Sequence, residues 1–148
     1  MTTQNPTQLS HSHQVLIING ERVSGLAPGD NPVELPTITL VEEEYGSDGI
    51  MYTMATSVKG GEVKVKLQPT SATVQTWMRD FARIQQGERI AYNGSYGDSE
   101  LGYNTALRGG VLKMAPPGVT PGVNAEFTFV FEECVPEFDS AQFRPAPN

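Results

Sequence analysis

The hydrophobic period of this chain changes at Pro69, and that change constrains the fold more than any other feature of the sequence. From Glu62 to Gln68 apolar and polar residues alternate, which places the apolar side chains on one face of a strand. The apolar members are Val63, Val65 and Leu67. Pro69 has no backbone N–H to donate to a sheet and should end this strand. Beyond it, apolar residues return at the helical spacing of three or four, so we expect a helix directly after the strand.

The expected helix lies between Ser71, which can cap its N-terminus, and Gly87, which can end it. Its apolar residues fall on one stripe, so the helix should lay that stripe on the sheet. We predict that five side chains of the stripe belong to the core: Val74, Trp77, Met78, Phe81 and Ile84.

The N-terminal part of the chain predicts further strands. Asn19-Gly20 lies inside residues 14–24 between strand-forming residues, and this dipeptide is typical of a hairpin turn that needs positive φ at both central positions. A strand is expected over Thr37–Glu42, after a loop rich in Pro, Gly and Asp. The strand ends in a crowd of acidic residues, which belong in water or against a basic surface because like charges repel when desolvated.

The C-terminal half combines glycine-rich segments with strands. We predict a short strand at Arg89–Tyr92 and a glycine-rich excursion over Asn93–Asn104. Leu107 and Leu112 lie five positions apart, so regular alternation would place them on opposite faces of one strand. A bulge at Gly109-Gly110 would bring both to the same face.

The clearest core strand is expected over Glu126–Glu133, where Phe127, Phe129 and Phe131 alternate with polar residues. The seven or eight expected strands and one helix predict a mostly β fold, an antiparallel β-sandwich or barrel with one amphipathic α-helix. We expect a polar N-terminal arm over residues 1–13, a single β-rich domain over 14–134 and a C-terminal arm over 135–148. Open edges of such a sheet template association, and pairing identical copies around a closed ring would remove them.

The composition argues against several classes of function. The 148 residues fit one domain, and ten basic against seventeen acidic residues give a net charge of −7, the opposite of what a protein that grips duplex nucleic acid needs. No apolar run reaches the roughly 18 residues of a membrane span, so we expect no membrane insertion. A single cysteine, Cys134, excludes an internal disulfide. We expect it to be a partly buried apolar residue in a protein assembled in a reducing cytoplasm.

Residues that could carry chemistry are few and poorly placed. His11 and His13 lie in the polar leader, too early to be positioned beside a buried serine and aspartate, and an HxH pair alone lacks the further ligands of a closed metal site. Asp98 and Glu100 could suggest paired acid and base groups, but they lie in a loop without an apolar wall to shift a pKa. The glycines do not form a phosphate-cradling loop. We expect no catalytic residues, no metal site and no cofactor.

Three segments carry a resemblance to a known family: YGSDG at residues 45–49, GGEVKVKLQPTS at 60–71, and the following helix with Trp77. In this order and spacing they resemble the tail tube proteins of contractile-tailed bacteriophages, which are similar to the tube protein of type VI secretion systems. With the opening hairpin and the closing Phe-rich strand, the resemblance covers most of the chain. It implies a β-sandwich with a flanking helix, assembled as hexameric rings that stack into the inner tail tube and conduct viral DNA into the host cell.

The resemblance also implies partners and a location. The partners would be further copies of the chain, the tail sheath protein, baseplate and tube-terminating proteins, and double-stranded DNA that passes without specific binding. The chain would belong to the virion, in a tail tube assembled in the host cytoplasm. A long loop would reach the adjacent ring, and its residues are Glu42, Glu43, Glu44, Tyr45 and Asp48. The two arms would add contacts between subunits.

Polar strand faces are the candidates for the wall of the passage, because a strand can bury its apolar side and show its polar side to water. These candidate residues are Glu62, Lys64, Lys66, Glu126, Thr128 and Glu132. Six copies would carry a formal charge of 6 × −7 = −42, and an acidic share facing inward would repel phosphate and let DNA slide. Three alternatives stay open: a monomeric β-barrel for a small ligand, a hydrolase that uses Asp98 or Glu100, and a cellular secretion or pyocin-like tube.

Overall fold

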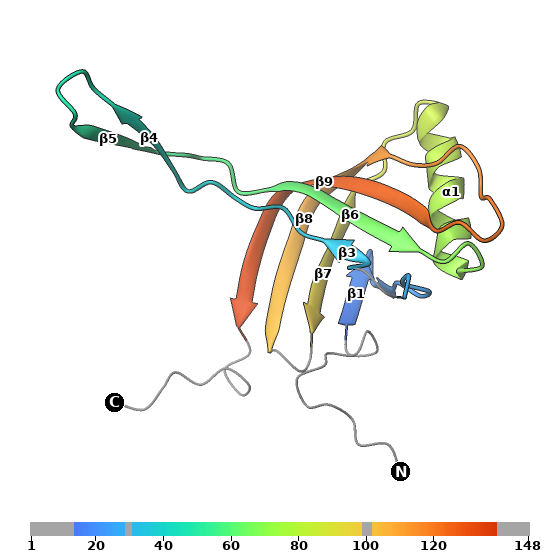
Figure 1. Ribbon diagram of the computed structural model, residues 1–148. Coiled ribbons are helices and arrows are strands. Elements are labelled where there is room, and N and C mark those ends of the chain that lie inside the picture. Colours follow the sequence, from blue (N-terminus) through green and yellow to red (C-terminus); the bar gives the residue numbers. More distant parts are fainter. Residues whose placement is uncertain (1–13, 29–30, 99–101, 139–148) are drawn as a thin grey trace, which may run out of the picture.

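In the computed structural model, which describes residues 14–28, 31–98 and 102–138, the chain forms a mostly antiparallel β fold with one helix among those residues (Figure 1). The elements are β1 (Gln14–Ile18), β2 (Glu21–Arg22), β3 (Val33–Glu34), β4 (Val41–Tyr45), β5 (Met51–Ala55), β6 (Gly61–Leu67), α1 (Ala72–Gln85), β7 (Tyr92–Asp98), β8 (Tyr103–Met114) and β9 (Ala125–Phe138). Within the described ranges, seven strands form one sheet in the order β2-β1-β7-β8-β9-β6-β3, and β4 and β5 form a separate hairpin. The predicted fold class is confirmed.

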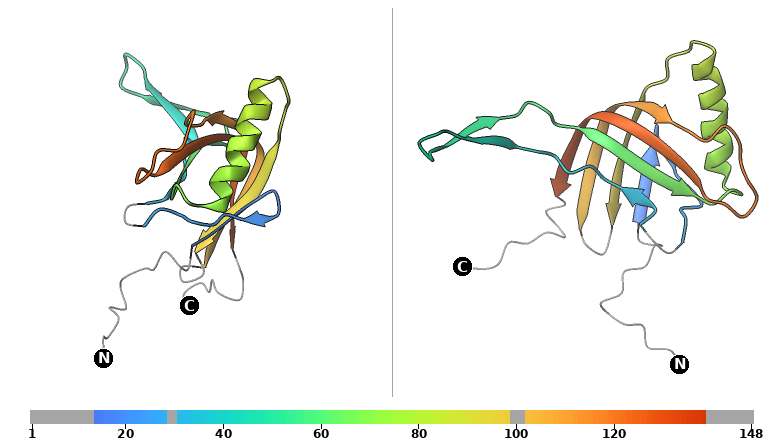
Figure 2. Two further views of the ribbon diagram at one scale, coloured as in Figure 1. Left: turned by 90° about the vertical axis from the view of Figure 1, so that its right-hand side faces the viewer. Right: turned by 45° about the horizontal axis from the view of Figure 1, so that its top comes forward.

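The large sheet is curled, so that the chain segment after β2 reaches β6 near the opposite end of the strand order. After β2 the chain runs along β6, where Leu26 bridges Leu67 and the N–H of Ala27 donates to the carbonyl of Lys66 at 3.0 Å. Residues 21–22 pair with β1 at one end of the sheet, and residues 33–34 pair with β6 at the other. The helix α1 stands at one end of the molecule, and the β4–β5 hairpin projects from the opposite end (Figures 1 and 2).

Local signals explain the first hairpin. Asn19 and Gly20 both have positive φ, 53° and 81°, as the turn between β1 and β2 requires. The side chain of Asn19 also accepts a hydrogen bond from the backbone N–H of Asn93 at 3.0 Å, which ties the turn to β7. The predicted hairpin at Asn19-Gly20 is confirmed.

The expected strand and helix around Pro69 are also confirmed. Val63, Val65 and Leu67 of β6 are buried. Ser71 caps α1, because its side-chain oxygen accepts a hydrogen bond from the N–H of Thr73 at 3.1 Å. Gln86 takes the C-cap position, and Gly87 follows it with φ of 102°. The N–H groups of Gly87 and Glu88 donate to carbonyls of the last helical turn.

The apolar stripe of α1 contributes less to the core than predicted. Val74 and Trp77 are buried, and Met78 packs against the core at its edge. Phe81 and Ile84 are only partly buried. Trp77 packs edge-on against Phe127 and Phe129 of β9, whereas Ile84 borders an open pocket beside Val111 and Leu112 of β8.

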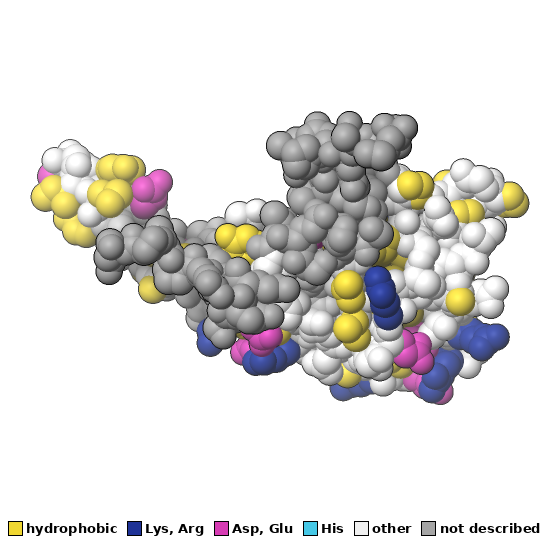
Figure 3. Space-filling model, turned by 90° about the horizontal axis from the view of Figure 1, so that it is seen from below, with side chains coloured by type: hydrophobic (Ala, Val, Ile, Leu, Met, Phe, Trp, Pro, Cys, Tyr) yellow, Lys and Arg dark blue, Asp and Glu magenta, His cyan; other side chains and the backbone are white. Residues whose placement is uncertain are grey.

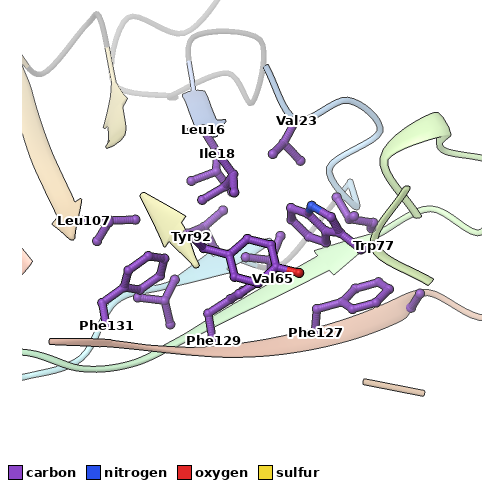
Figure 4. Packing of buried hydrophobic residues seen from close by; sticks show 14 of the residues in the cluster. Leu16, Ile18, Val23, Val65, Trp77, Tyr92, Leu107, Phe127, Phe129 and Phe131 are labelled. Atoms are coloured by element: carbon purple, nitrogen blue, oxygen red, sulfur yellow. The ribbon is translucent and has the colours of Figure 1, made fainter. Parts of the chain in front are cut away.

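Aromatic rings fill the interior of the curled sheet. Phe127, Phe129 and Phe131 of β9 are buried as predicted, and in Figure 4 they lie opposite the side chains of β1. The ring of Phe129 packs edge-on against Trp77 and Tyr92, with centroid distances of 4.9 and 5.0 Å. The interior is thus a packed core.

Two strand predictions are wrong in position. The strand expected over Thr37–Glu42 begins only at Val41, and residues 35–40 connect it to the large sheet. The glycine-rich residues predicted as an excursion from Asn93 form most of β7 and the start of β8. Gly94 allows β7 to pack closely against β1, because a Cβ at this position would lie 1.9 Å from the carbonyl oxygen of Ile17.

The predicted bulge in the glycine pair is confirmed. Arg108 and Gly109 of β8 together face Asn93 of β7, and Gly109 has φ of 66°. Its N–H donates to the side-chain oxygen of Asn93 at 3.0 Å. Leu107 is buried and Leu112 packs against the same core, as expected for a bulge between them.

The C-terminal boundary of the domain lies later than predicted. Strand β9 runs four residues past 134, so residues 135–138 of the expected C-terminal arm belong to the sheet.

Candidate assembly surface

The β4–β5 hairpin is the most unusual surface of the molecule. All ten of its strand residues are exposed, and it extends away from the large sheet (Figures 1 and 2). Glu42, Glu43, Glu44 and Tyr45, which were expected in a long loop, lie in β4 and pair with β5. These four residues form a strand and not a loop, because β5 supplies the backbone partners that a loop would lack. Their contact with an adjacent ring stays a prediction.

The turn at the tip is held by its own hydrogen bonds. The N–H of Gly46 donates to the carbonyl of Ile50, and the N–H of Gly49 donates to the carbonyl of Gly46, both at 3.0 Å. The carboxylate of Asp48 accepts the N–H of Ile50, also at 3.0 Å. The hairpin therefore has a defined tip, and Asp48 helps to form it.

On one face of the hairpin, acidic and apolar side chains lie on different strands. Glu42 pairs with Met54 and Glu44 with Tyr52, so each pair shares a face with the acid on β4 and the apolar residue on β5. Met54 is 70% exposed and Tyr52 56%. In Figure 3 hydrophobic side chains gather on this arm with acidic ones beside them. An apolar surface of this kind is typical of a protein contact.

The apolar strand β5 was not predicted from the sequence. A signal was available, since Met51-Tyr52-Thr53-Met54 has β-forming residues and follows an acidic run across a Gly-containing turn.

An apolar groove lies where the hairpin joins the body. Its volume is about 540 Å³, and it is bounded by the two connections of the hairpin and by the C-terminal half of β9. The lining residues are Leu35, Pro36, Ile38, Leu40, Thr56, Val58, Lys59, Thr105, Cys134, Val135 and Pro136. The connections are held together by the N–H of Thr56, which donates to the carbonyl of Leu40 at 3.1 Å. Cys134 is buried, as predicted, and burial raises the pKa of its thiol.

The candidate residues for the wall of the passage are brought together on β6 and β9, which pair along residues 61–67. Glu126 and Glu132 are exposed, and Glu62, Lys64 and Lys66 are partly exposed. Thr128 is only 2% exposed, so the prediction that it faces water is wrong. It lies between Lys64 and Met114 in the strand register, and long side chains on both sides cover it.

Charges on this face are nearly balanced. Three glutamates and two lysines among the six candidates sum to −1. Lys66 lies 4.0 Å from Glu34, and Lys113 of β8 bonds to Glu62. The Lys113 ammonium lowers the pKa of the Glu62 carboxyl through this hydrogen bond and its charge.

The residues considered for catalysis do not form a site in the described part of the chain. Asp98 lies at the end of β7, partly buried, whereas His11, His13 and Glu100 are outside the described residues. Among residues 14–28, 31–98 and 102–138, no three His, Cys, Asp or Glu residues could hold a metal ion together. Over the same ranges, no helix is long and apolar enough to cross a membrane.

Tyr92 is a buried ionisable residue that contributes to packing. The hydroxyl of Tyr92 donates to the carboxylate of Asp80 at 3.0 Å, while the ring lies against Phe129. Burial, together with the nearby Asp80 charge, raises the pKa of Tyr92 far above its usual value.

Three chains of known structure that are similar in fold come from structures of a sheath-tube complex or of a tube terminator. A chain of the sheath/tube terminator of the extracellular contractile injection system PVC, in the extended state, is 11% identical with a TM-score of 0.58, over 92% of this chain and 99% of that chain. A chain of the tube-terminating cap of the anti-feeding prophage AFP is 12% identical with a TM-score of 0.54, over 94% and 95%. A chain of the PVC sheath-tube complex, also extended, is 11% identical with a TM-score of 0.53, over 90% and 94%.

No family model and no curated protein matches the sequence. At 11–12% identity the structural likeness shows a common fold, and it extends over nearly the whole length of each chain compared. This chain is therefore similar in fold to components of contractile tube assemblies.

Proposed function

We propose that this chain is a structural subunit of the tube of a contractile tail or contractile injection particle, with no enzymatic role. One observation carries the proposal: a hairpin exposed along its whole length projects from a chain whose fold matches chains of tube assemblies. A two-stranded hairpin is only marginally stable alone in water. Coverage by another subunit would stabilise the hairpin and would make it a contact between subunits.

In this proposal, hexameric rings form because neighbouring copies complete each other's strand edges. Beyond Phe131, β9 pairs with β8 on one side. The other edge of this part of β9 makes one backbone hydrogen bond among the described residues. The N–H of Cys134 donates to the carbonyl of Lys59 at 2.8 Å. An edge of this length is a template for a strand from a second copy. Repetition of that contact around an axis closes a ring.

Rings would then stack through the β4–β5 hairpin and the two terminal arms, and the stack would enclose the passage. If the polar face of β6 and β9 lines it, the six candidate residues contribute 6 × −1 = −6 per ring, far less than the whole-chain charge suggests. Charges this sparse are screened within roughly 8 Å at physiological salt. Duplex DNA would pass such a wall without specific binding.

Reversing charges on the polar face of β6 and β9 tests whether this face lines the passage. Glu126→Lys with Glu132→Lys changes two exposed side chains of this face from acidic to basic. DNA delivery by particles that carry the double variant should fall, because fixed positive charges bind phosphate. Unchanged delivery would refute a luminal position of this face.

The finer assignment that we propose is the inner tail tube of a contractile bacteriophage, in the virion and assembled in the host cytoplasm. Its partners would be the sheath, baseplate and tube-terminating proteins. A pyocin-like or secretion tube would use the same interfaces, so particles purified from the source cells would separate these cases by whether they contain DNA-filled heads.

A monomeric ligand-binding barrel gains little support from the interior, which is filled by the rings of Phe127, Phe129 and Phe131. Light scattering of the purified protein over a concentration series distinguishes the two functions. The tube subunit should give oligomers whose mass grows with concentration. A single species of 16.1 kDa at every concentration would sink the tube proposal.

A further inference from the structure

We propose that the apolar groove at the base of the hairpin is the acceptor for the β4–β5 hairpin of a second copy of this chain. The inference rests on the proposed tube function and deepens it, because it names both halves of one contact between subunits. The hairpin is the donor, residues 41–55, and the groove is the acceptor.

The two surfaces match in polarity. Donor side chains Tyr52 and Met54 stand more than half exposed on one face of the hairpin. Acceptor side chains Leu40 and Val58 are 76% and 64% exposed at the wall of the groove. Each surface leaves apolar area in water, and bringing them together removes both areas at once.

Their charges match as well. The donor strand β4 carries three consecutive glutamates, 42–44, which form no salt bridge within the described structure. The groove is lined by Lys59, an exposed side chain that is likewise without a salt bridge among the described residues. Attraction between the glutamates of β4 and the ammonium of Lys59 would favour the hairpin of a second copy as the partner and would fix its orientation in the groove.

The geometry prevents a chain from filling its own groove. No residue of 41–55 lines it, and the hairpin points away from the body (Figure 1). The contact must therefore form between copies, and it joins two different surfaces. Such a head-to-tail contact repeats from copy to copy and ends in a closed ring or a continuing stack. Because the groove walls are the connections of the acceptor's own hairpin, each docked hairpin would also brace the next one.

Cysteine crosslinking of mixed copies tests the contact. In a Cys134→Ala background, one copy carries Tyr52→Cys on the donor and the other carries Val58→Cys in the acceptor. The matched control replaces Val58→Cys with Val111→Cys, a valine on β8 with similar exposure, 54% against 64%. We expect a disulfide-linked dimer from the Val58 pair in assembled material and a loss of that product in the Val111 pair.

Assembly without a crosslink at Val58, or with equal yield at Val111, would overturn the acceptor assignment and leave the tube proposal standing. Absence of any assembly by unsubstituted protein would overturn both. A second pair of variants tests the contact without crosslinking. Val58→Glu places a negative charge in the groove, where it would repel the glutamates of the docked hairpin, and should abolish stacking. The control Val111→Glu should not. Equal assembly by both would also contradict the inference.

Discussion

Replacing Tyr52 and Met54 by threonine would remove much of the apolar surface of the hairpin while keeping a residue type that favours strands. The two residues lie two positions apart on β5, on one face, and are 56% and 70% exposed. Burying a large apolar side chain completely contributes about 1.5–3 kcal/mol. Allowing for the fraction still exposed and for what threonine retains, the pair should contribute about 2 kcal/mol to each subunit contact.

That free energy corresponds to a roughly 30-fold rise in the protein concentration needed for assembly. A sedimentation series of diluted protein would measure this concentration. Urea unfolding of the dissociated subunit should change by no more than about 0.5 kcal/mol, because both side chains are already in water. The matched control is Val111→Thr with Met114→Thr on β8, where the exposed fractions are 54% and 52%. Equal shifts for both pairs, or a loss confined to unfolding stability, would refute the reasoning.

Three further predictions concern the subunit itself. Phe129→Ala should lower the free energy of unfolding by about 3–5 kcal/mol, as measured by urea titration, because it empties the place of a fully buried ring at the centre of the aromatic cluster. A change below 1 kcal/mol would mean that the cluster is not the core, by the same scale. Gly94→Ala should destabilise strongly and disrupt the pairing of β1 with β7, since the new Cβ would meet the carbonyl of Ile17; amide hydrogen exchange would report the loss, and unchanged protection would contradict the close approach. Unfolding stability should fall as the pH rises above about 10, the ordinary tyrosine pKa. The raised pKa of Tyr92 keeps the folded state protonated there while the unfolded state loses its proton, so Tyr92→Phe should flatten this decline in a pH series of urea melts, and an equal slope would disprove the assignment.

Sequence reasoning succeeded where a residue acts through its immediate neighbours. The Asn19-Gly20 turn, the Ser71 cap and the alternation around Phe129 each depend on a few adjacent positions, and all three occur as expected. Glycine was harder to interpret. Gly94 permits a turn and equally permits close strand packing, and only the position of β1 across from it decides between them.

The candidate surface depends on contacts that sequence patterns do not report. The family resemblance placed the acidic residues of β4 in a long loop. Hydrophobic alternation could not reveal their pairing with β5, because a strand exposed on both faces has no such alternation. Alternation placed Thr128 on the polar face but could not show that neighbouring strands cover it. The groove unites residues 35–40 and 56–59 with 134–136, segments whose meeting is a property of the sheet order.

Cryo-electron microscopy of concentrated purified protein tests self-association most directly. The account predicts hollow rods of stacked rings, in which backbone pairing continues from one copy to the next and each β4–β5 hairpin is covered by another copy. Dispersed single subunits with the hairpin bare at every concentration, or solid aggregates without a passage, would contradict it.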